Sequence, residues 1–555
     1  MKNYANMQTL NGLWDFTFVQ AELSDTEICN IAMTDIVIVP GCFDAASKFF
    51  GKRGTGIYRR EVRCSGKIQL EFQAIGLRAR IFWDGKPVAT IPWAFTPQSV
   101  VIDNPAEEAC HQLTVAVENT FEQGDSAMYH PFYDFYAFGG IYRSVTLREL
   151  ADTVWLDRIQ VTPLSVAEGT ADVAVFLAGA PEARPVKIYI DDILCAEETI
   201  TGSGNAVCKV PAPAAPWTPE NPVLHKIKVC TGNDFLETHF GLRTLSWNDG
   251  QLKLNGKPLK LIGYCRHDSH PETGYAISES RVLADMKLIK EQGCNFVRGS
   301  HYNQSEFLLD CCDRLGLLVW NESCGWGNKE EQCADPVFVQ KQVEQSAIMV
   351  QETYNHPSII MWGCMNELAS DTPAGRNILE QIFKKFRELD QSRPVTFASN
   401  RRKADICYDL VDIISTNIYP GWYDEEIHFD DSDQVLPCLK DFEEYFSGEE
   451  FRNKPWIISE IGAAAMIGDH SGGRWSEEYQ AKIIGNTMDF VLKSERCTGT
   501  ALWLFANANT YFDAIHVMTR PRGFNNKGLL SEYRAPKLAW HLMTEMMKRA
   551  NPADK

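Results

Sequence analysis

IIMWGCMNE at residues 359–367 and PWIISE at residues 455–460 each run through apolar residues and then reach a glutamate. Similar apolar runs recur from residue 246 onward and alternate with amphipathic helical patterns, which is typical of parallel strands linked by helices. The predicted strands are 259–264, 295–298, 317–321, 359–364, 395–398, 413–417, 456–459 and 501–505. The predicted helices are 279–292, 304–315, 336–354, 374–389 and 477–494. This alternation predicts a (β/α)8 TIM barrel over residues 246–555.

Short strand patterns without intervening helices precede the barrel. Runs at 36–39, 68–72, 80–83 and 113–117 are separated by Gly, Pro, Asp and Asn, which predicts an antiparallel β-sandwich domain over residues 1–152. Runs at 173–176, 186–190 and 225–229 surround a proline-rich stretch at 210–222. Their number and spacing predict an immunoglobulin-like β-sandwich over residues 153–245.

Charge and cysteine usage limit the partners of the protein. The net charge of −19 disfavours nucleic acids and anionic membranes, which need a concentrated basic surface. No export signal or apolar run long enough to cross a bilayer is present, so we expect a cytoplasmic protein with no membrane partner. The 17 cysteines are scattered and lack zinc-ligand spacing, which indicates reduced thiols.

Barrel active sites lie at the carboxyl ends of the strands, so the polar residues that follow each apolar run are the candidates for chemistry. They are Arg266-His267-Asp268, Arg298-Gly299-Ser300-His301, Asn321-Glu322, Asn366-Glu367, Asn417 with Tyr419, Glu460, and Asn507. Two carboxylates facing one cavity are what glycoside hydrolysis requires. Glu367 follows an apolar strand, and partial burial raises a carboxyl pKa and suits a general acid. We expect Tyr419 to hydrogen-bond Glu460 and hold it ionised.

Two alternatives stay open from the residues alone. Glu322 is a rival for a direct catalytic role. His267, His301 and Arg298 are candidates for a metal cluster, but no HxH or HExxH spacing is present, which favours hydroxyl binding or structural pairing. We therefore expect no metal and no organic cofactor.

Several motifs in order resemble glycoside hydrolase family 2, most closely its bacterial β-glucuronidases. They are LNGLWDF at 10–16, FGGIYRSV at 138–145, FGLRT at 240–244, NGKPLKLIGYCRHD at 255–268, NFVRGSHY at 295–302, MNE at 365–367 and the segment ending in Glu460. The resemblance implies a jelly-roll domain, an immunoglobulin-like domain and a barrel. It also implies retention through a covalent glycosyl-enzyme, with Glu460 as nucleophile, Glu367 as acid/base and carboxyl groups about 5 Å apart. Asn366 is then the residue that binds the sugar 2-hydroxyl.

The stretch RPRGFNNKGLL at 520–530 resembles the Asn-x-Lys motif by which β-glucuronidases hold the C6 carboxylate. This resemblance places Asn525 and Lys527 on a uronate, where an ammonium and an amide give charge-assisted hydrogen bonds. Arg520 and Arg522 add positive charge beside them. The resemblance also implies substrate contacts at other positions, namely Asp134, His267, His301, Asn417, Tyr419, Tyr423 and Trp503.

The sequence departs from the glucuronidase pattern at Pro521, where an arginine is expected, and this leaves the contact with O4 unassigned. The connection after Glu322 is also short, so we expect no long loop covering the aglycone. We predict a retaining exo-β-glycosidase that hydrolyses β-D-glucuronides, with small-molecule or oligosaccharide β-glycosides as substrates. The family resemblance also implies a homo-oligomer, either a dimer or a tetramer. The alternatives are β-galacturonidase or β-galactosidase activity, or a catalytically silent carbohydrate-binding protein.

Overall fold

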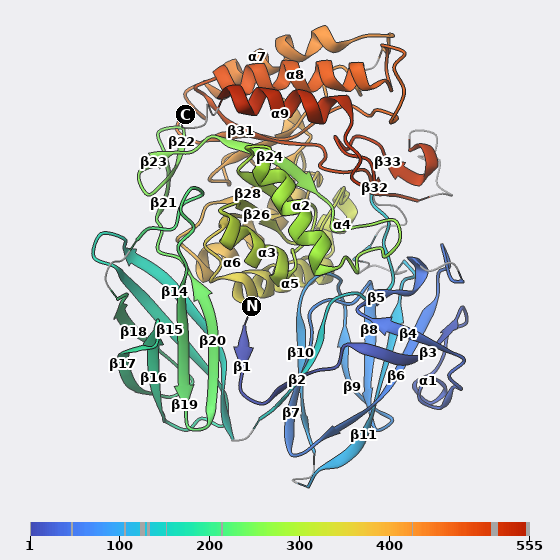
Figure 1. Ribbon diagram of the computed structural model, residues 1–555, viewed down its shortest axis with the longest axis vertical. Helices are drawn as coiled ribbons and strands as arrows, with labels where there is room; N and C mark the ends of the chain where they lie inside the picture. Colours follow the sequence, from blue (N-terminus) through green and yellow to red (C-terminus); the bar gives the residue numbers. More distant parts are fainter. Residues whose placement is uncertain are drawn as a thin grey trace.

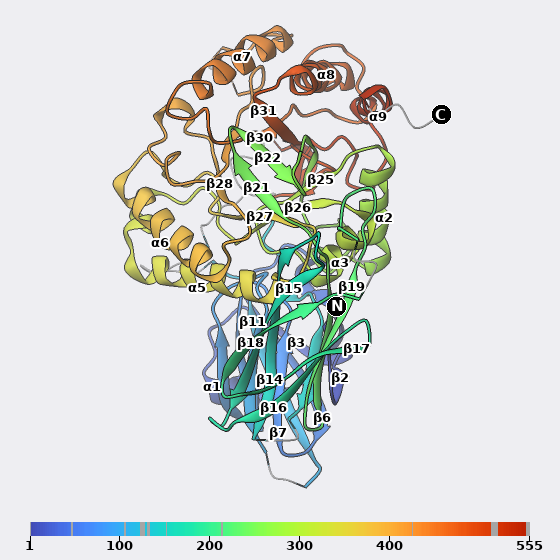
Figure 2. The same cartoon turned by 90° about the vertical axis from the view of Figure 1, so that its left-hand side faces the viewer.

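Eight parallel strands close a barrel in chain order in the computed structural model, which describes residues 2–45, 48–104, 107–121, 128–129, 134–150, 153–211, 215–423, 426–511 and 520–550. The barrel strands are β24 (Leu261–Arg266), β25 (Phe296–Gly299), β26 (Leu318–Glu322), β27 (Ile359–Cys364), β28 (Val395–Ser399), β29 (Ile414–Asn417), β30 (Trp456–Ile461) and β31 (Cys497–Leu502). Figure 1 shows the barrel above two β-rich modules that lie side by side, and Figure 2 shows both modules below it after a quarter turn. The predicted fold class is confirmed.

The helices lie outside the barrel, and several of them begin at a side-chain cap. They are α2 (Glu279–Glu291), α3 (Glu306–Leu315), α4 (Glu330–Ala334), α5 (Pro336–Thr353), α6 (Pro373–Leu389), α7 (Val435–Phe446), α8 (Glu477–Lys493) and α9 (Leu538–Ala550). The side chains of Ser278, Ser305 and Ser476 each accept a hydrogen bond from a backbone N–H in the first turn of α2, α3 and α8. Short 3-10 turns occur at Phe43–Ala45, Arg402–Ala404, Ser432–Gln434 and Pro521–Gly523.

Some predicted boundaries were wrong. The last barrel strand was expected at 501–505 but is Cys497–Leu502, because Thr498, Gly499 and Thr500 interrupt the apolar pattern at its start. Helices α4, α7 and α9 were not predicted. The other barrel strands agree with the prediction to within a few residues.

The first module is a jelly-roll sandwich of two antiparallel sheets in strand order β10-β7-β13-β2 and β4-β3-β6-β11-β8-β9. The strands of the two sheets are β2 (Met7–Thr9), β3 (Gly12–Val19), β4 (Asp35–Val39), β6 (Thr55–Cys64), β7 (Lys67–Phe72), β8 (Arg78–Trp83), β9 (Lys86–Ile91), β10 (Gln98–Asp103), β11 (Ala109–Glu118) and β13 (Val145–Glu149). A short pair, β5 (Gly41–Cys42) with β12 (Gly140–Ile141), and helix α1 (Asp25–Asn30) complete the module. Alternate apolar residues of both sheets, such as Trp14 and Leu70, form its core.

The second module is an immunoglobulin-like sandwich of a five-stranded sheet, β1-β20-β19-β16-β17, and a three-stranded sheet, β14-β15-β18. Its strands are β1 (Asn3–Tyr4), β14 (Val154–Ser165), β15 (Thr170–Gly179), β16 (Arg184–Ile190), β17 (Ile193–Ile200), β18 (Ser203–Lys209), β19 (His225–Thr231) and β20 (Asp234–Phe240). Strand β1 was assigned to the first domain by the sequence, but it pairs with β20 of the second. The sequence predicted the boundary between the first and second domains at residue 152. Residues 151–152 lie outside the residues that the structure describes, so this boundary stays a prediction.

A small sheet of β21 (Leu245–Asn248), β22 (Gln251–Leu254) and β23 (Lys257–Pro258) leads into the barrel. The second module contacts the amino-terminal side of the barrel strands: Arg243 donates to the carbonyls of Pro357 and Ile359, both at 2.7 Å. The first module instead reaches the carboxyl ends, where Arg143 donates to the carbonyl of Asn303 at 2.9 Å. Among the described residues, these contacts place the first module, and not the second, beside a site at the carboxyl ends.

Side-chain packing inside the barrel supports that site from below. An ideal Cβ on Gly363 would lie 1.8 Å from the indole nitrogen of Trp320, so a larger residue at this position would displace the indole. The guanidinium of Arg298 lies over the Trp320 ring, 4.5 Å from its centroid. Arg298 is fully buried, and its position is fixed by this packing.

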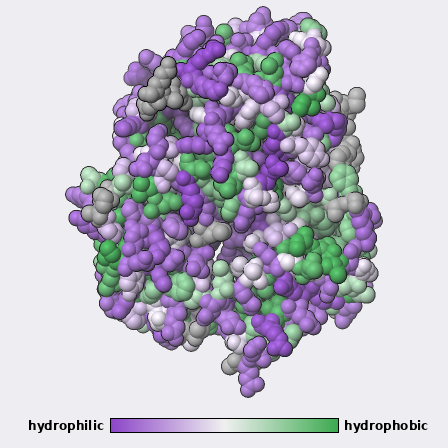
Figure 3. All heavy atoms as spheres, viewed as in Figure 1, coloured by the Kyte–Doolittle hydropathy of each residue, from purple (hydrophilic) through white to green (hydrophobic). Residues whose placement is uncertain are grey.

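The surface seen in one view is mostly polar. Figure 3 shows a face that is largely hydrophilic, with hydrophobic side chains in scattered patches. Among the described residues, the helices are all too short or too polar to span a membrane. All 17 cysteines are free thiols.

Candidate active site

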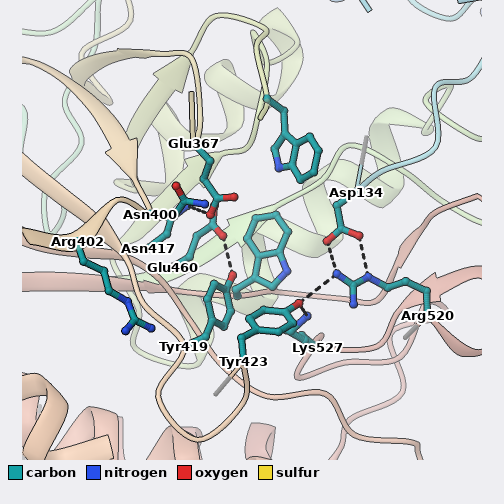
Figure 4. Close-up of a pocket in the computed structure, with 12 residues that line it drawn as sticks. Asp134, Glu367, Asn400, Arg402, Asn417, Tyr419, Tyr423, Glu460, Arg520 and Lys527 are labelled. Carbon is teal, nitrogen blue, oxygen red and sulfur yellow. Dashed lines mark hydrogen bonds and ion pairs between the residues drawn. The ribbon is translucent and has the colours of Figure 1, made fainter. Parts of the chain in front are cut away.

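A cavity of about 310 Å³ opens at the carboxyl ends of the barrel strands. Figure 4 shows the residues that line it: Asp134, Trp326, Glu367, Asn400, Arg402, Asn417, Tyr419, Tyr423, Glu460, Trp503, Arg520 and Lys527. Asp134 comes from the first module and all the others come from the barrel. The cavity thus contains both predicted carboxylates and carries cations at two of its sides.

Glu460, near the end of β30, accepts hydrogen bonds at both carboxylate oxygens. Arg298 Nη1 donates to Oε1 at 2.8 Å, and the Tyr419 hydroxyl donates to Oε2 at 2.6 Å. Burial, and then the charge of Glu460, raise the pKa of Tyr419 well above its ordinary value, so the hydroxyl stays a donor. These two hydrogen bonds fix the orientation of the Glu460 carboxylate in the cavity.

Glu367 lies just beyond β27, and its environment favours the protonated form. Burial, followed by the neighbouring charge of Glu460, raises the pKa of Glu367 to about 8. Asn417 Nδ2 donates to Oε1 at 2.8 Å and offsets part of this shift. The backbone of Glu367 has a φ of 56°, in the left-handed region that non-glycine residues seldom adopt. Two nearby carboxyl groups with separated protonation states are the usual arrangement for an acid and a nucleophile.

Arg298 joins four strand ends beneath the cavity. Besides Glu460, its guanidinium donates to both oxygens of Glu322, at 3.0 and 3.3 Å, and to Asn366 Oδ1 at 2.8 Å. Glu322 is fully buried and is not among the cavity-lining residues, so its role is to pair with Arg298. Asn366 Nδ2 is buried and has no hydrogen-bond partner within the described part of the chain.

Asp134 and Arg520 meet on the side of the cavity away from Glu367. Arg520 donates from Nε to Oδ1 at 2.7 Å and from Nη2 to Oδ2 at 2.6 Å, a two-pronged ion pair between module and barrel. Burial is the largest single influence and would raise the pKa of Asp134, but the charge and hydrogen bonds of Arg520, together with the Lys527 charge, hold that pKa below its ordinary value. Asn525 Nδ2 also donates to Asp134, at 2.9 Å, and Asn525 is not a cavity-lining residue.

Lys527 lies beside this pair and is almost fully buried. Its ammonium donates to the Tyr423 hydroxyl at 2.6 Å and lies 4.8 Å from the Tyr423 ring centroid. Burial, followed by the charge of Arg520, lowers the pKa of Lys527 well below its ordinary value. A buried ammonium without a carboxylate partner is strongly stabilised by an incoming anion.

Arg522 does not reach the cavity, in contrast to the sequence expectation. It has a φ of 62°, and its guanidinium pairs with Glu532 at 2.8 Å, with nearly half of the side chain exposed. The turn at Arg522 sends its side chain away from the direction taken by Arg520. Of the two arginines, Arg520 is the one that faces the cavity.

His267 and His301 lie behind the cavity wall. The His301 ring stacks on Trp503 with centroids 5.1 Å apart, and burial lowers the pKa of His301 to about 3, so it is neutral. His267 is within hydrogen-bond distance of the Tyr302 hydroxyl, at 3.2 Å. In the described part of the chain, the group with metal-ligand spacing is Asp310, Asp313 and His356, which does not line the cavity. Both histidine rings pack against Trp503, and the His267 ring meets it edge-on with centroids 5.3 Å apart.

Comparison with known proteins identifies the family. The model of the glycosyl hydrolases family 2 TIM barrel domain matches residues 245–551. The chain belongs to glycoside hydrolase family 2. It is 26% identical to the β-glucuronidase of Streptococcus agalactiae, over 98% of this chain and 96% of the relative. It is 29% identical to the β-glucuronidase of Rattus norvegicus, over 78% of this chain and 70% of the relative.

A solved structure of a β-galacturonidase from Eisenbergiella tayi bound to galacturonate is also similar to this family 2 chain. It has a TM-score of 0.89 and 32% identity, with 98% of each chain covered. Together, the family model and these relatives make the protein a glycoside hydrolase and argue against a catalytically silent carbohydrate-binding protein.

Three cavity residues of this glycoside hydrolase were not predicted from the sequence. Asn400 and Arg402 follow β28, the one barrel strand whose carboxyl end was left out of the search. The strand-end rule would have found them in the SNRRK segment at 399–403. Trp326 lies in the short connection after β26, where its backbone forms a bridge with Asn366.

Proposed function

We propose that the protein is a retaining exo-hydrolase of β-D-uronides, with β-D-glucuronides as the first expected substrates. The observation that carries this proposal is the buried ammonium of Lys527, which lies in the same cavity as Glu367 and Glu460 and has no carboxylate partner within hydrogen-bond distance among the described residues. A neutral sugar would leave this charge desolvated and uncompensated, whereas a uronate supplies the missing anion.

In the first step, the Glu460 carboxylate attacks the anomeric carbon while Glu367 donates its proton to the glycosidic oxygen. The C1–O bond breaks, the alcohol leaves, and a glycosyl ester forms on Glu460. In the second step, Glu367, now a carboxylate, removes a proton from water, which attacks the anomeric carbon and releases the uronic acid with retained configuration. Glu367 then carries a proton again.

The surroundings of each carboxyl group support these roles. Arg298 and Tyr419 each donate a hydrogen bond to Glu460 and hold its carboxylate in position for attack. The raised pKa of Glu367, about 8, keeps its proton available at neutral pH. The unpaired Nδ2 of Asn366 supports a hydrogen bond to the sugar 2-hydroxyl, the role that the family resemblance implies.

The same cavity also supports a second candidate, a β-galacturonidase. The two uronates differ only at C4, and the sequence has Pro521 where glucuronidases have an arginine. In addition, the β-galacturonidase from Eisenbergiella tayi is 32% identical over nearly the whole chain, a higher identity than that of the β-glucuronidases compared above.

The decisive experiment measures kcat/KM on the p-nitrophenyl β-D-glucuronide, β-D-galacturonide and β-D-galactoside. We expect a uronide to be preferred over the galactoside by at least about 100-fold, because removing the substrate charge leaves Lys527 unpaired. The ratio of the two uronides identifies the C4 epimer. Proton NMR of the first-formed product tests retention, which requires the β-anomer to appear before the α-anomer.

Lys527→Met tests the role of the ammonium at nearly constant side-chain length. We expect it to remove most of the uronide preference, while Lys440→Met, at an exposed lysine on α7, keeps the preference. A preference for the neutral galactoside that Lys527→Met does not change would overturn the uronide assignment. It would leave only glycoside hydrolysis.

A further inference from the structure

Trp326, Asn400 and Arg402 line the cavity and have no part in the mechanism above. Figure 4 shows Asn400 and Arg402 on the same side as Glu367, opposite Asp134 and Arg520. The uronate carboxylate is proposed to lie on the Asp134 and Arg520 side. Because Glu367 protonates the departing oxygen, the leaving group must lie on the Glu367 side, against Asn400 and Arg402. Trp326 also lies near Glu367 in the fold, since its backbone forms a bridge with Asn366.

Arg402 is set apart by its lack of an ion pair in the part of the chain that the structure describes. Its neighbours are both paired: Arg401 lies 3.3 Å from Asp371, and Lys403 lies 2.7 Å from Asp441. Arg402 is exposed and lines the cavity, in a protein whose net charge is −19. Carboxylates outnumber basic groups in this chain, yet Arg402 forms an ion pair with none of those in the described residues. Its guanidinium is therefore available to an anionic ligand.

The chemistry of the three residues fits a sugar better than a flat apolar group. An indole face packs against the C–H groups of a sugar ring, and a carboxamide both donates to and accepts from hydroxyls. A guanidinium pairs in two-pronged fashion with a carboxylate or a sulfate.

We propose that Trp326, Asn400 and Arg402 form a leaving-group subsite for an anionic sugar residue, so that the substrate is an acidic oligosaccharide. In such a substrate, one acidic group lies at Lys527 and a second lies at Arg402, on either side of the bond that breaks. This inference rests on the proposed uronide hydrolysis and adds the class of leaving group.

The test compares two aryl β-D-uronides that carry a 4-carboxymethyl or a 4-carbamoylmethyl group on the ring, made with the preferred epimer. The methylene separates the charge from the phenolic oxygen, so the two leaving groups have nearly equal acidity. The measured quantity is the ratio of kcat/KM for the anionic glycoside to that for the neutral one. A third glycoside, with a 4-sulfomethyl group, shows whether a sulfonate is preferred to a carboxylate.

We expect Arg402→Gln to lower the anionic-to-neutral ratio roughly fivefold to tenfold at low salt, as for loss of one exposed charge-assisted contact. Arg402→Lys should restore most of the ratio. Lys403→Gln, which makes the same charge change on a neighbour outside the cavity, should keep the wild-type ratio. In 0.5 M salt the effect of Arg402→Gln should shrink toward unity.

An Arg402→Gln ratio equal to wild type, or an equal fall in Lys403→Gln, would overturn the leaving-group subsite. Failure of the wild-type enzyme to cleave even the neutral aryl uronide would instead refute the proposed function itself. The two failures are therefore distinguishable in one set of assays.

Discussion

Replacing Glu367 by Gln should make the protein more stable at neutral pH while it disables the enzyme. The pKa of Glu367 is raised from its ordinary value of 4.5 to about 8 in the folded state. Below pH 4.5 both folded and unfolded states are protonated at this position, and the carboxyl has no pH-dependent effect. Between pH 4.5 and about 8 only the unfolded state ionises, so the free energy of unfolding falls by about 1.4 kcal/mol per pH unit. At pH 7 the loss reaches at most about 3.5 kcal/mol.

The glutamine side chain has nearly the same shape, and its oxygen accepts the hydrogen bond from Asn417 that Glu367 accepts at 2.8 Å. The variant should therefore avoid the pH-dependent loss. Urea unfolding of wild type and Glu367→Gln, followed by tryptophan fluorescence from pH 5 to pH 9, measures the difference. We expect the advantage of the variant to grow with pH up to about 8 and then level off.

Glu449→Gln is the control, because the Glu449 side chain is 91% exposed on the surface. It should change the free energy of unfolding by less than about 0.5 kcal/mol at every pH. A stability difference for Glu367→Gln that does not vary between pH 5 and 8 would refute the reasoning, since it would mean that the folded state does not hold the proton.

The remaining predictions concern activity. The alkaline limb of kcat/KM should fall as pH rises through about 8, because Glu367 then loses the proton that it donates, and this limb should disappear in Glu367→Gln. Glu460→Gln should reduce kcat at least about 1000-fold on every glycoside, and residual turnover within tenfold of wild type would contradict its role as nucleophile. Tyr419→Phe removes the donor at 2.6 Å from Glu460 and should lower kcat while KM changes little, a split that a purely structural role would not produce. Lys527→Met should lower kcat/KM for uronides about 100-fold to 1000-fold with little change on the galactoside, and equal losses on both would contradict uronate binding.

Much of the barrel could be predicted because its fully buried strands leave long apolar runs. The run at 359–364 coincides with β27, and Glu367 follows it at the carboxyl end. The rule that active sites lie at strand ends then gave both carboxylates. The start of β31 was missed because Thr498 and Gly499 are buried by tertiary packing rather than by being apolar.

Side-chain direction could not be predicted from the sequence. The sequence alone does not distinguish Arg520 from Arg522 as a substrate contact. In the structure, Arg520 pairs with Asp134 and Arg522 pairs with Glu532. The backbone turn between them decides the outcome, and the partner of Arg520 lies 386 positions away in sequence. Asn525 was expected to bind the substrate, but its side chain donates to Asp134 instead. Its direction too is set by the backbone turn and not by the order of residues in the sequence.

The origin of Asp134 in the first module has a consequence for biosynthesis. The jelly-roll sandwich leaves the ribosome before the barrel does, because Arg520 follows Asp134 by 386 positions in the chain. The cavity therefore comes into being only when the final barrel strand and the segment after it have closed onto a module that folded long before. Nascent chains that stop short of this segment are expected to be inert, so the cell gains no hydrolytic activity from incomplete copies.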